Sequence, residues 1–144
     1  MNQTLLYKIS NVIAAIFIFL FAYTSVSKLL NMQPFQFTIK SSPFIGQWPS
    51  LIAWSVVFAE WIVVLLLLYP PLRWIGFYLS LLLMSAFTIY IAYMLTTVSH
   101  LPCSCGGILK QLSWKAHLVL NVFLTLLSLA GVIVEKKRRK LLYS

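Results

Sequence analysis

Four apolar stretches, each close to twenty residues long, constrain this chain more than any other feature. They cover residues 9–27, 51–69, 74–98 and 118–134, and Glu60 is the only charged residue within them. A helix needs about 20 mostly apolar residues to cross a bilayer, and in the bilayer only helices and closed barrels satisfy the backbone. Barrel strands would alternate apolar and polar residues, and these stretches do not. The sequence therefore predicts an all-α fold, an integral membrane four-helix bundle.

The composition excludes the other broad classes of protein. Charged residues make up 9% of the chain and hydrophobic residues 61%, whereas a soluble domain carries about 25% charged residues. So little charge cannot cover a water-facing surface, and disordered chains are polar and poor in aromatic residues. At 144 residues, we expect one transmembrane domain, residues 1–144, in contact with the lipid bilayer.

The positive charges predict how the bundle is oriented. The net charge is +9, and five basic residues follow one another at 136–140. We interpret residues 136–144 as a basic cytoplasmic tail near anionic lipid head groups, with no nucleic acid as a partner. Four spans place both termini on one side, which holds seven of the eleven Lys and Arg residues. The positive-inside rule then predicts cytoplasmic termini, and connections at 27–50 and 99–117 that face the periplasm of a bacterial inner membrane.

The only two cysteines, Cys103 and Cys105, stand in the second of these outer connections with one serine between them. An extracytoplasmic compartment permits disulfides. Bridging so close a pair requires a bent, strained backbone, and strained disulfides tend to be labile or catalytic. The next two residues, Gly106 and Gly107, would let another backbone approach. We therefore predict a redox-active dithiol or disulfide.

The surroundings of the pair suggest a role for each sulfur. A helical turn expected at 108–112 would place Cys105 near a helix N-terminus, where thiol pKa values fall. We interpret Cys105 as the attacking thiol, Cys103 as its resolving partner, and His117 as the residue that aids proton movement. Two interpretations stay open beside this one. The first is a Cu(I) or zinc site with His100 or His117 as third ligand, and the second is a cysteine pair with no chemical role.

Polar residues inside the apolar stretches form a second group of candidates. A carboxylate as deep as Glu60 costs at least about 2–3 kcal/mol in a membrane, so it must face the bundle interior and be paired or protonated. It is interpreted either as a proton carrier or anchor for a quinone-like molecule, or as a packing hydrogen bonder. The helical spacing of His117, Asn121 and Thr125 predicts one face that lines the interior. Lys28 is expected to extend to the outer interface, with stabilisation of a thiolate as the alternative.

Three stretches carry a family resemblance. They are the segment from Ser27-Lys28 to Ser42-Pro43, the helix around Glu60, and the block Leu-Pro-Cys-Ser-Cys-Gly-Gly at 101–107, followed by Leu-Ser-Trp-Lys-Ala-His at 112–117. On these residues the chain resembles the MauE/DoxX-like family of small four-helix membrane proteins, in its methylamine utilisation MauE branch. The resemblance spans nearly the whole chain.

The resemblance implies a membrane protein of periplasmic thiol–disulfide exchange. Such a protein would support disulfide formation or maturation of a client protein, together with a thioredoxin-like partner, and would use Cys103 and Cys105 as its redox pair. We therefore expect a thiol–disulfide oxidoreductase, with a quinone as the one cofactor considered and no resident metal. Two alternatives are a non-catalytic membrane assembly or chaperone subunit, and a thiol-ligated metal handler.

Overall fold

The computed structural model describes residues 2–97 and 113–144, which fold into α-helices and one short 3₁₀ helix. The elements are α1 (Gln3–Leu30), α2 (Met32–Lys40), α3 (Pro49–Leu68), η1 (Pro70–Leu72), α4 (Arg73–Thr97) and α5 (Trp114–Tyr143). Four segments are long and apolar enough to cross a membrane: α1, α3, η1 with α4, and α5. No strand occurs within the two described ranges. The prediction of an all-α, four-helix membrane fold is confirmed.

The helices extend beyond the apolar stretches that predict them. α1 begins at Gln3, and α5 continues to Tyr143 through the basic residues expected to form a tail. The bilayer requires only the middle of each helix to be apolar, so polar turns can project from it. Basic side chains near the end of α5 also complement the negative end of its helix dipole.

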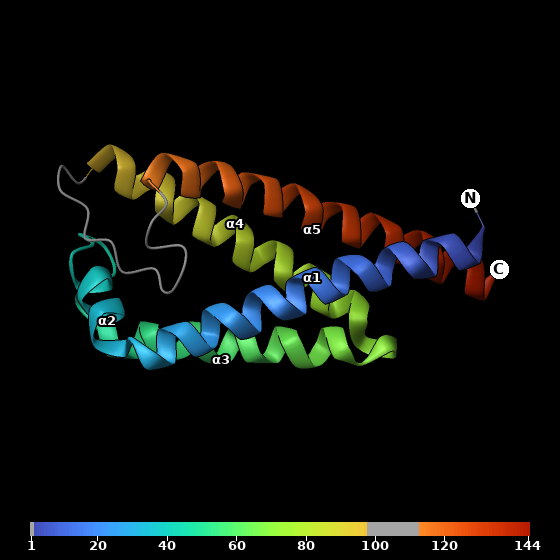
Figure 1. Ribbon diagram of the computed structural model, residues 1–144, viewed down its shortest axis with the longest axis horizontal. Coiled ribbons are helices and arrows are strands. Elements are labelled where there is room, and N and C mark those ends of the chain that lie inside the picture. Colours follow the sequence, from blue (N-terminus) through green and yellow to red (C-terminus); the bar gives the residue numbers. More distant parts are fainter. Residues whose placement is uncertain (1, 98–112) are drawn as a thin grey trace.

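The long helices form a ring in the order α1, α3, α4, α5. α1 packs against α3 and α5, and α4 packs against the same two helices. Both termini lie at one end of the bundle, here called the terminal end, while α2 lies at the opposite end, the loop end (Figure 1). In this view α4 and α5 diverge from α1 and α3 toward the loop end. The two halves of the bundle are therefore packed differently.

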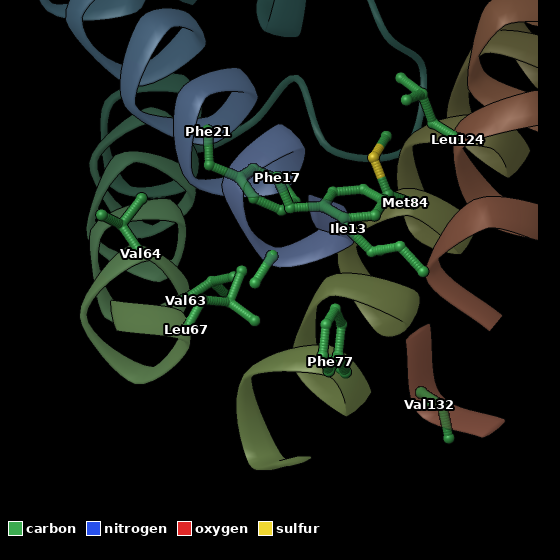
Figure 2. Packing of buried hydrophobic residues seen from close by; sticks show 11 residues of the cluster. Ile13, Phe17, Phe21, Val63, Val64, Leu67, Phe77, Met84, Leu124 and Val132 are labelled. Atoms are coloured by element: carbon green, nitrogen blue, oxygen red, sulfur yellow. The ribbon is translucent and has the colours of Figure 1, made fainter. Parts of the chain in front are cut away.

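Apolar side chains fill the bundle from its middle toward the terminal end, and Figure 2 shows this cluster from close by. Gly131 of α5 allows the closest approach in this region, because an added Cβ would lie 2.6 Å from two ring carbons of Phe77 on α4. The buried residues of this core are Ile13, Ala14, Phe17, Phe21, Val63, Val64, Leu67, Phe77, Met84, Leu124 and Val132.

Buried polar contacts close the terminal end. Glu135 of α5 is buried, accepts a hydrogen bond from Ser10 Oγ of α1 at 2.7 Å, and pairs with Arg138. Arg73, at the start of α4, donates to Asn11 Oδ1 at 2.5 Å and to a backbone carbonyl of α3 at 3.1 Å. These bonds tie α1 to α5 and to the hairpin between α3 and α4. The terminal end is thus fastened by charge-assisted bonds as well as by packing.

Candidate functional site

A cavity of about 370 Å³ lies between the helices in the half of the bundle nearer the loop end. All five α-helices contribute to its lining. Its wall is mainly apolar, and it includes the rings of Phe21, Phe35, Phe87 and Tyr90. Pockets for small ligands span about 300–1,000 Å³, so the cavity is large enough for a compact molecule.

An ion pair between Lys28 and Glu60 lines this cavity. Lys28 Nζ donates to Glu60 Oε1 at 2.6 Å, and Thr24 Oγ1 donates to the same oxygen at 3.3 Å. The Glu60 side chain is fully buried and the Lys28 side chain is 14% exposed. The prediction that Glu60 faces the interior and is paired is confirmed. The expectation that Lys28 extends to the outer interface is wrong, because its ammonium group points into the bundle.

Helix geometry explains why Lys28 turns inward. Side chains on a helix tilt toward the N-terminus of that helix. α1 ends at the loop end and α3 begins there, so the Lys28 side chain tilts deeper into the bundle while the Glu60 side chain tilts toward the loop end. An unpaired carboxylate at this depth would cost considerable free energy. Pairing with Glu60 therefore stabilises the Lys28 ammonium group inside the bundle relative to a position in water.

Helix α2 holds an aromatic ring against the ion pair. Lys28 Nζ lies 5.7 Å from the ring centre of Phe35 on α2 and 5.4 Å from that of Phe87 on α4, which are cation–π distances. The sequence predicted residues 27–50 as a connection, and it did not predict the helix within them. A helix is compatible with Pro34 because this residue lies in its first turn, where a backbone N–H is not needed for the helix.

The polar face of α5 completes the site. His117 and Asn121 both line the cavity, and Asn121 is buried. Asn121 Nδ2 donates to the carbonyl of His117 at 2.9 Å, within the same helix. The hydroxyl groups of Thr125 and Thr88 lie 3.2 Å apart and join α5 to α4. The helical spacing thus places these side chains inside the bundle as predicted, and Thr125 provides the contact between helices.

The second carboxylate oxygen of Glu60 takes no part in the ion pair with Lys28. Glu60 Oε2 is buried and has no hydrogen-bond partner among the described residues. Most buried polar atoms in proteins are paired, and an ionised carboxylate can only accept hydrogen bonds. The cavity wall therefore presents an acceptor that a bound molecule with a hydroxyl or amine could satisfy.

Comparison with known proteins places the chain in a family. The family described as methylamine utilisation protein MauE matches residues 6–134, all but the first five and the last ten residues. The chain belongs to the MauE family. No curated protein matches it, and no solved structure does. Membership implies a multi-pass membrane protein of methylamine utilisation, and the matched range includes every residue that lines the cavity.

In this MauE family protein, four of the residues predicted from the sequence share one cavity: Lys28, Glu60, His117 and Asn121. The remaining predicted site residues lie outside the described ranges; they are Cys103, Cys105, Gly106 and Gly107. The flanking residues that are described, Thr97 at the end of α4 and Ser113 at the start of α5, belong to the loop end. Ser113 caps α5, since its side chain accepts a hydrogen bond from the Ala116 N–H at 3.2 Å.

Sequence reasoning missed the aromatic part of the site. Phe35, Phe87 and Tyr90 line the cavity, yet none was singled out, because aromatic residues are common throughout this chain. The helical spacing of Phe87 and Tyr90 was the available signal: residues three apart lie on one face of a helix. Nothing in the sequence marks Phe35, whose position depends on α2.

Proposed function

We propose that this protein takes part in periplasmic thiol–disulfide exchange, with Cys103 and Cys105 as the redox pair that supports maturation of a client protein. One observation carries the proposal. The described residues that flank the cysteine-containing stretch, Thr97 at the end of α4 and Ser113 before α5, lie at the loop end, the same end as the cavity with Lys28 and His117. The family supplies the process, methylamine utilisation, in which we propose that the client protein acts.

The proposed orientation has the terminal end in the cytoplasm and the loop end in the periplasm of a bacterial inner membrane. The basic residues support this orientation. Arg73 and the run at 136–140 belong to the terminal end, and cytoplasmic segments of membrane proteins carry an excess of Lys and Arg. In this orientation the cysteines lie in a compartment that permits disulfides.

The exchange would proceed through a mixed disulfide. The Cys105 thiolate attacks a disulfide of the partner, a bond forms between Cys105 and one partner sulfur, and the other partner sulfur leaves as a thiolate. Cys103 then attacks Cys105, which closes the Cys103–Cys105 bridge and releases the partner as a dithiol. Two electrons pass from the cysteine pair to the partner. In reverse, the same steps introduce a disulfide into a client, and His117 takes up and returns the thiol proton.

Single cysteine variants test the proposal. Cys103→Ser should accumulate a mixed disulfide between Cys105 and the partner, because the resolving thiol is missing, and Cys105→Ser should not. The measurement is non-reducing electrophoresis of alkylated membranes, with the trapped partner identified by mass spectrometry. Full client oxidation by both single variants and by the double variant would refute thiol exchange. If replacements at Glu60 or Asn121 then disrupted a complex, the result would favour an assembly subunit.

A further inference from the structure

We propose that the cavity binds the ring of a membrane-dissolved quinol, with one ring hydroxyl donating a hydrogen bond to Glu60 Oε2. Quinol here means a 1,4-dihydroxylated aromatic ring that carries an apolar tail. The proposal concerns binding, and it stands independently of the thiol exchange proposed above.

The position of the cavity favours a ligand that arrives from the lipid. Most of its lining comes from the membrane-spanning helices, for example Phe21 of α1, Val56 of α3 and Leu124 of α5. Ala86 of α4 also lines the cavity, and it is an exposed residue of a membrane-spanning helix. We infer that the cavity opens to the bilayer beside this residue. A molecule dissolved in the hydrocarbon region can enter there without passing through water.

The charges of the wall favour a neutral ligand. Among the described lining residues, Lys28 and Glu60 are the only Lys, Arg, Asp or Glu, and they neutralise each other at 2.6 Å. A fatty acid or another anion would bring a second carboxylate to a site whose ammonium is already paired. It would also leave Glu60 Oε2 without a hydrogen-bond donor, which a buried acceptor requires.

The polar groups favour a hydroxyl on the ligand. Glu60 Oε2 needs a donor, because it is buried and has no partner among the described residues. A phenolic hydroxyl is such a donor, whereas a quinone carbonyl can only accept. The unmet acceptor thus selects the reduced, hydroxylated ring over the oxidised one.

Aromatic walls favour a flat ring beside this hydroxyl. Phe35 and Phe87 both approach Lys28 Nζ, at 5.7 and 5.4 Å, so their rings stand next to the anchoring carboxylate. Phe21 and Tyr90 also line the cavity. Aromatic pairs prefer offset-stacked or edge-to-face arrangements, and a planar ring can satisfy both between such walls. An aliphatic chain would fill the space without these contacts.

The test uses the purified full chain in phosphatidylcholine nanodiscs under anaerobic conditions, with decylubiquinol as the probe. Empty nanodiscs report the partition of the probe into lipid, and decylubiquinone and 1-decanol serve as ligand controls. We expect saturable retention of decylubiquinol above the empty nanodiscs, approaching one molecule per chain, and at least about tenfold weaker retention of decylubiquinone. Equal retention of the two forms, or of decanol and the quinol, would overturn the proposal.

Two kinds of variant locate the site. Glu60→Gln removes the anionic acceptor, and we expect binding to weaken at least about tenfold. Leu120→Trp fills the cavity from α5, whereas Val119→Trp adds the same side chain to the adjacent residue, which is 69% exposed. We expect the first tryptophan variant to lose binding and the second to retain it. This pair keeps the proposal testable if Glu60→Gln does not fold, and equal effects of the two tryptophans would refute it.

A chain with both Cys103→Ser and Cys105→Ser separates the two proposals. We expect it to retain decylubiquinol like the unaltered chain, because every described residue of the cavity wall is unchanged in this variant. Loss of thiol exchange with intact binding supports the quinol site. If the unaltered chain exchanges thiols but shows no saturable binding of decylubiquinol, the quinol site is refuted and the thiol exchange is not.

Discussion

Replacing Lys28 by methionine tests how much the buried ion pair contributes to stability. Methionine keeps an unbranched side chain of similar length between the rings of Phe35 and Phe87, but it removes the charge that faces Glu60. The carboxylate, which is fully buried, then loses its counter-charge. The substitution therefore separates the effect of charge from the effect of volume.

The structure gives the expected size of this loss. At the 2.6 Å separation of Lys28 Nζ and Glu60 Oε1, two unit charges attract by roughly 6 kcal/mol at an effective dielectric constant of about 20. Desolvation of both ions offsets much of this attraction. Removing one member of a buried pair costs about 3–5 kcal/mol. Thr24 still donates to the same oxygen at 3.3 Å, so we expect the lower value, about 3 kcal/mol.

The assay is equilibrium unfolding of the full chain in mixed micelles by increasing amounts of sodium dodecyl sulfate, followed by circular dichroism. Lys28→Met should lower the free energy of unfolding by about 3 kcal/mol. The double variant Lys28→Met/Glu60→Gln should recover at least about half of this loss, because no buried charge remains. The matched control is Lys8→Met, at an exposed position of the same helix, which should change stability by no more than about 0.5 kcal/mol.

Two outcomes would refute this reasoning. One is a loss below about 1 kcal/mol for Lys28→Met, the size of an ordinary surface pair. The other is a double variant no more stable than the single variant, which would mean that the two charges do not act on each other.

Two further substitutions test the terminal half of the bundle by the same unfolding assay. Gly131→Ala should destabilise the protein by about 1–3 kcal/mol, since the new Cβ would lie 2.6 Å from ring carbons of Phe77; a gain in stability, as expected for Gly→Ala in an unobstructed helix, would contradict the close packing. Ser10→Ala removes the 2.7 Å hydrogen bond to buried Glu135 and should lower the free energy of unfolding by about 1.5–3 kcal/mol. Ser55→Ala, at an exposed serine that bonds only to its own helix, should stay within about 0.5 kcal/mol, and an equal loss for both serines would disprove the special role of the buried bond.

The membrane spans could be predicted from the sequence because the bilayer imposes a length and a composition on them. A continuous apolar stretch such as 51–69 meets both requirements for a membrane-spanning helix, sufficient length and apolar composition. The same constraint stops at the interface, so the sequence did not predict that α5 reaches Tyr143. It also did not predict α2, which is too short to span a membrane and contains Pro34.

The candidate site could be predicted in part. Depth alone required a partner for Glu60, but the partner itself depends on which helices are neighbours. Lys28 follows directly after an apolar stretch, where extension to the interface is the common behaviour of lysine. Side chains on α1 and α3 tilt in opposite directions, which brings Lys28 and Glu60 toward each other. The pairing can be predicted from this tilt only when the two helices are known to be adjacent.

The cavity could not be predicted from the sequence at all. Its volume depends on how far α4 and α5 diverge from α1 and α3 toward the loop end (Figure 1), and the two pairs of helices are held together elsewhere by contacts such as the close approach of Gly131 on α5 to Ile13 on α1. Such contacts join residues far apart in the chain, and a pattern along the sequence does not record them. The unpaired oxygen of Glu60 is a consequence of the same geometry.

The uneven packing of the bundle separates two kinds of evolutionary constraint. Residues such as Phe17 and Leu67 sit in the dense region that keeps the helices associated, so changes there put the whole scaffold at risk. Apolar residues that face the hollow, such as Val56 and Leu120, have fewer neighbours to disturb and tolerate exchange more easily. Homologous proteins with this architecture can therefore change which ligand the loop-end half of the bundle binds, while the terminal half keeps the helices associated.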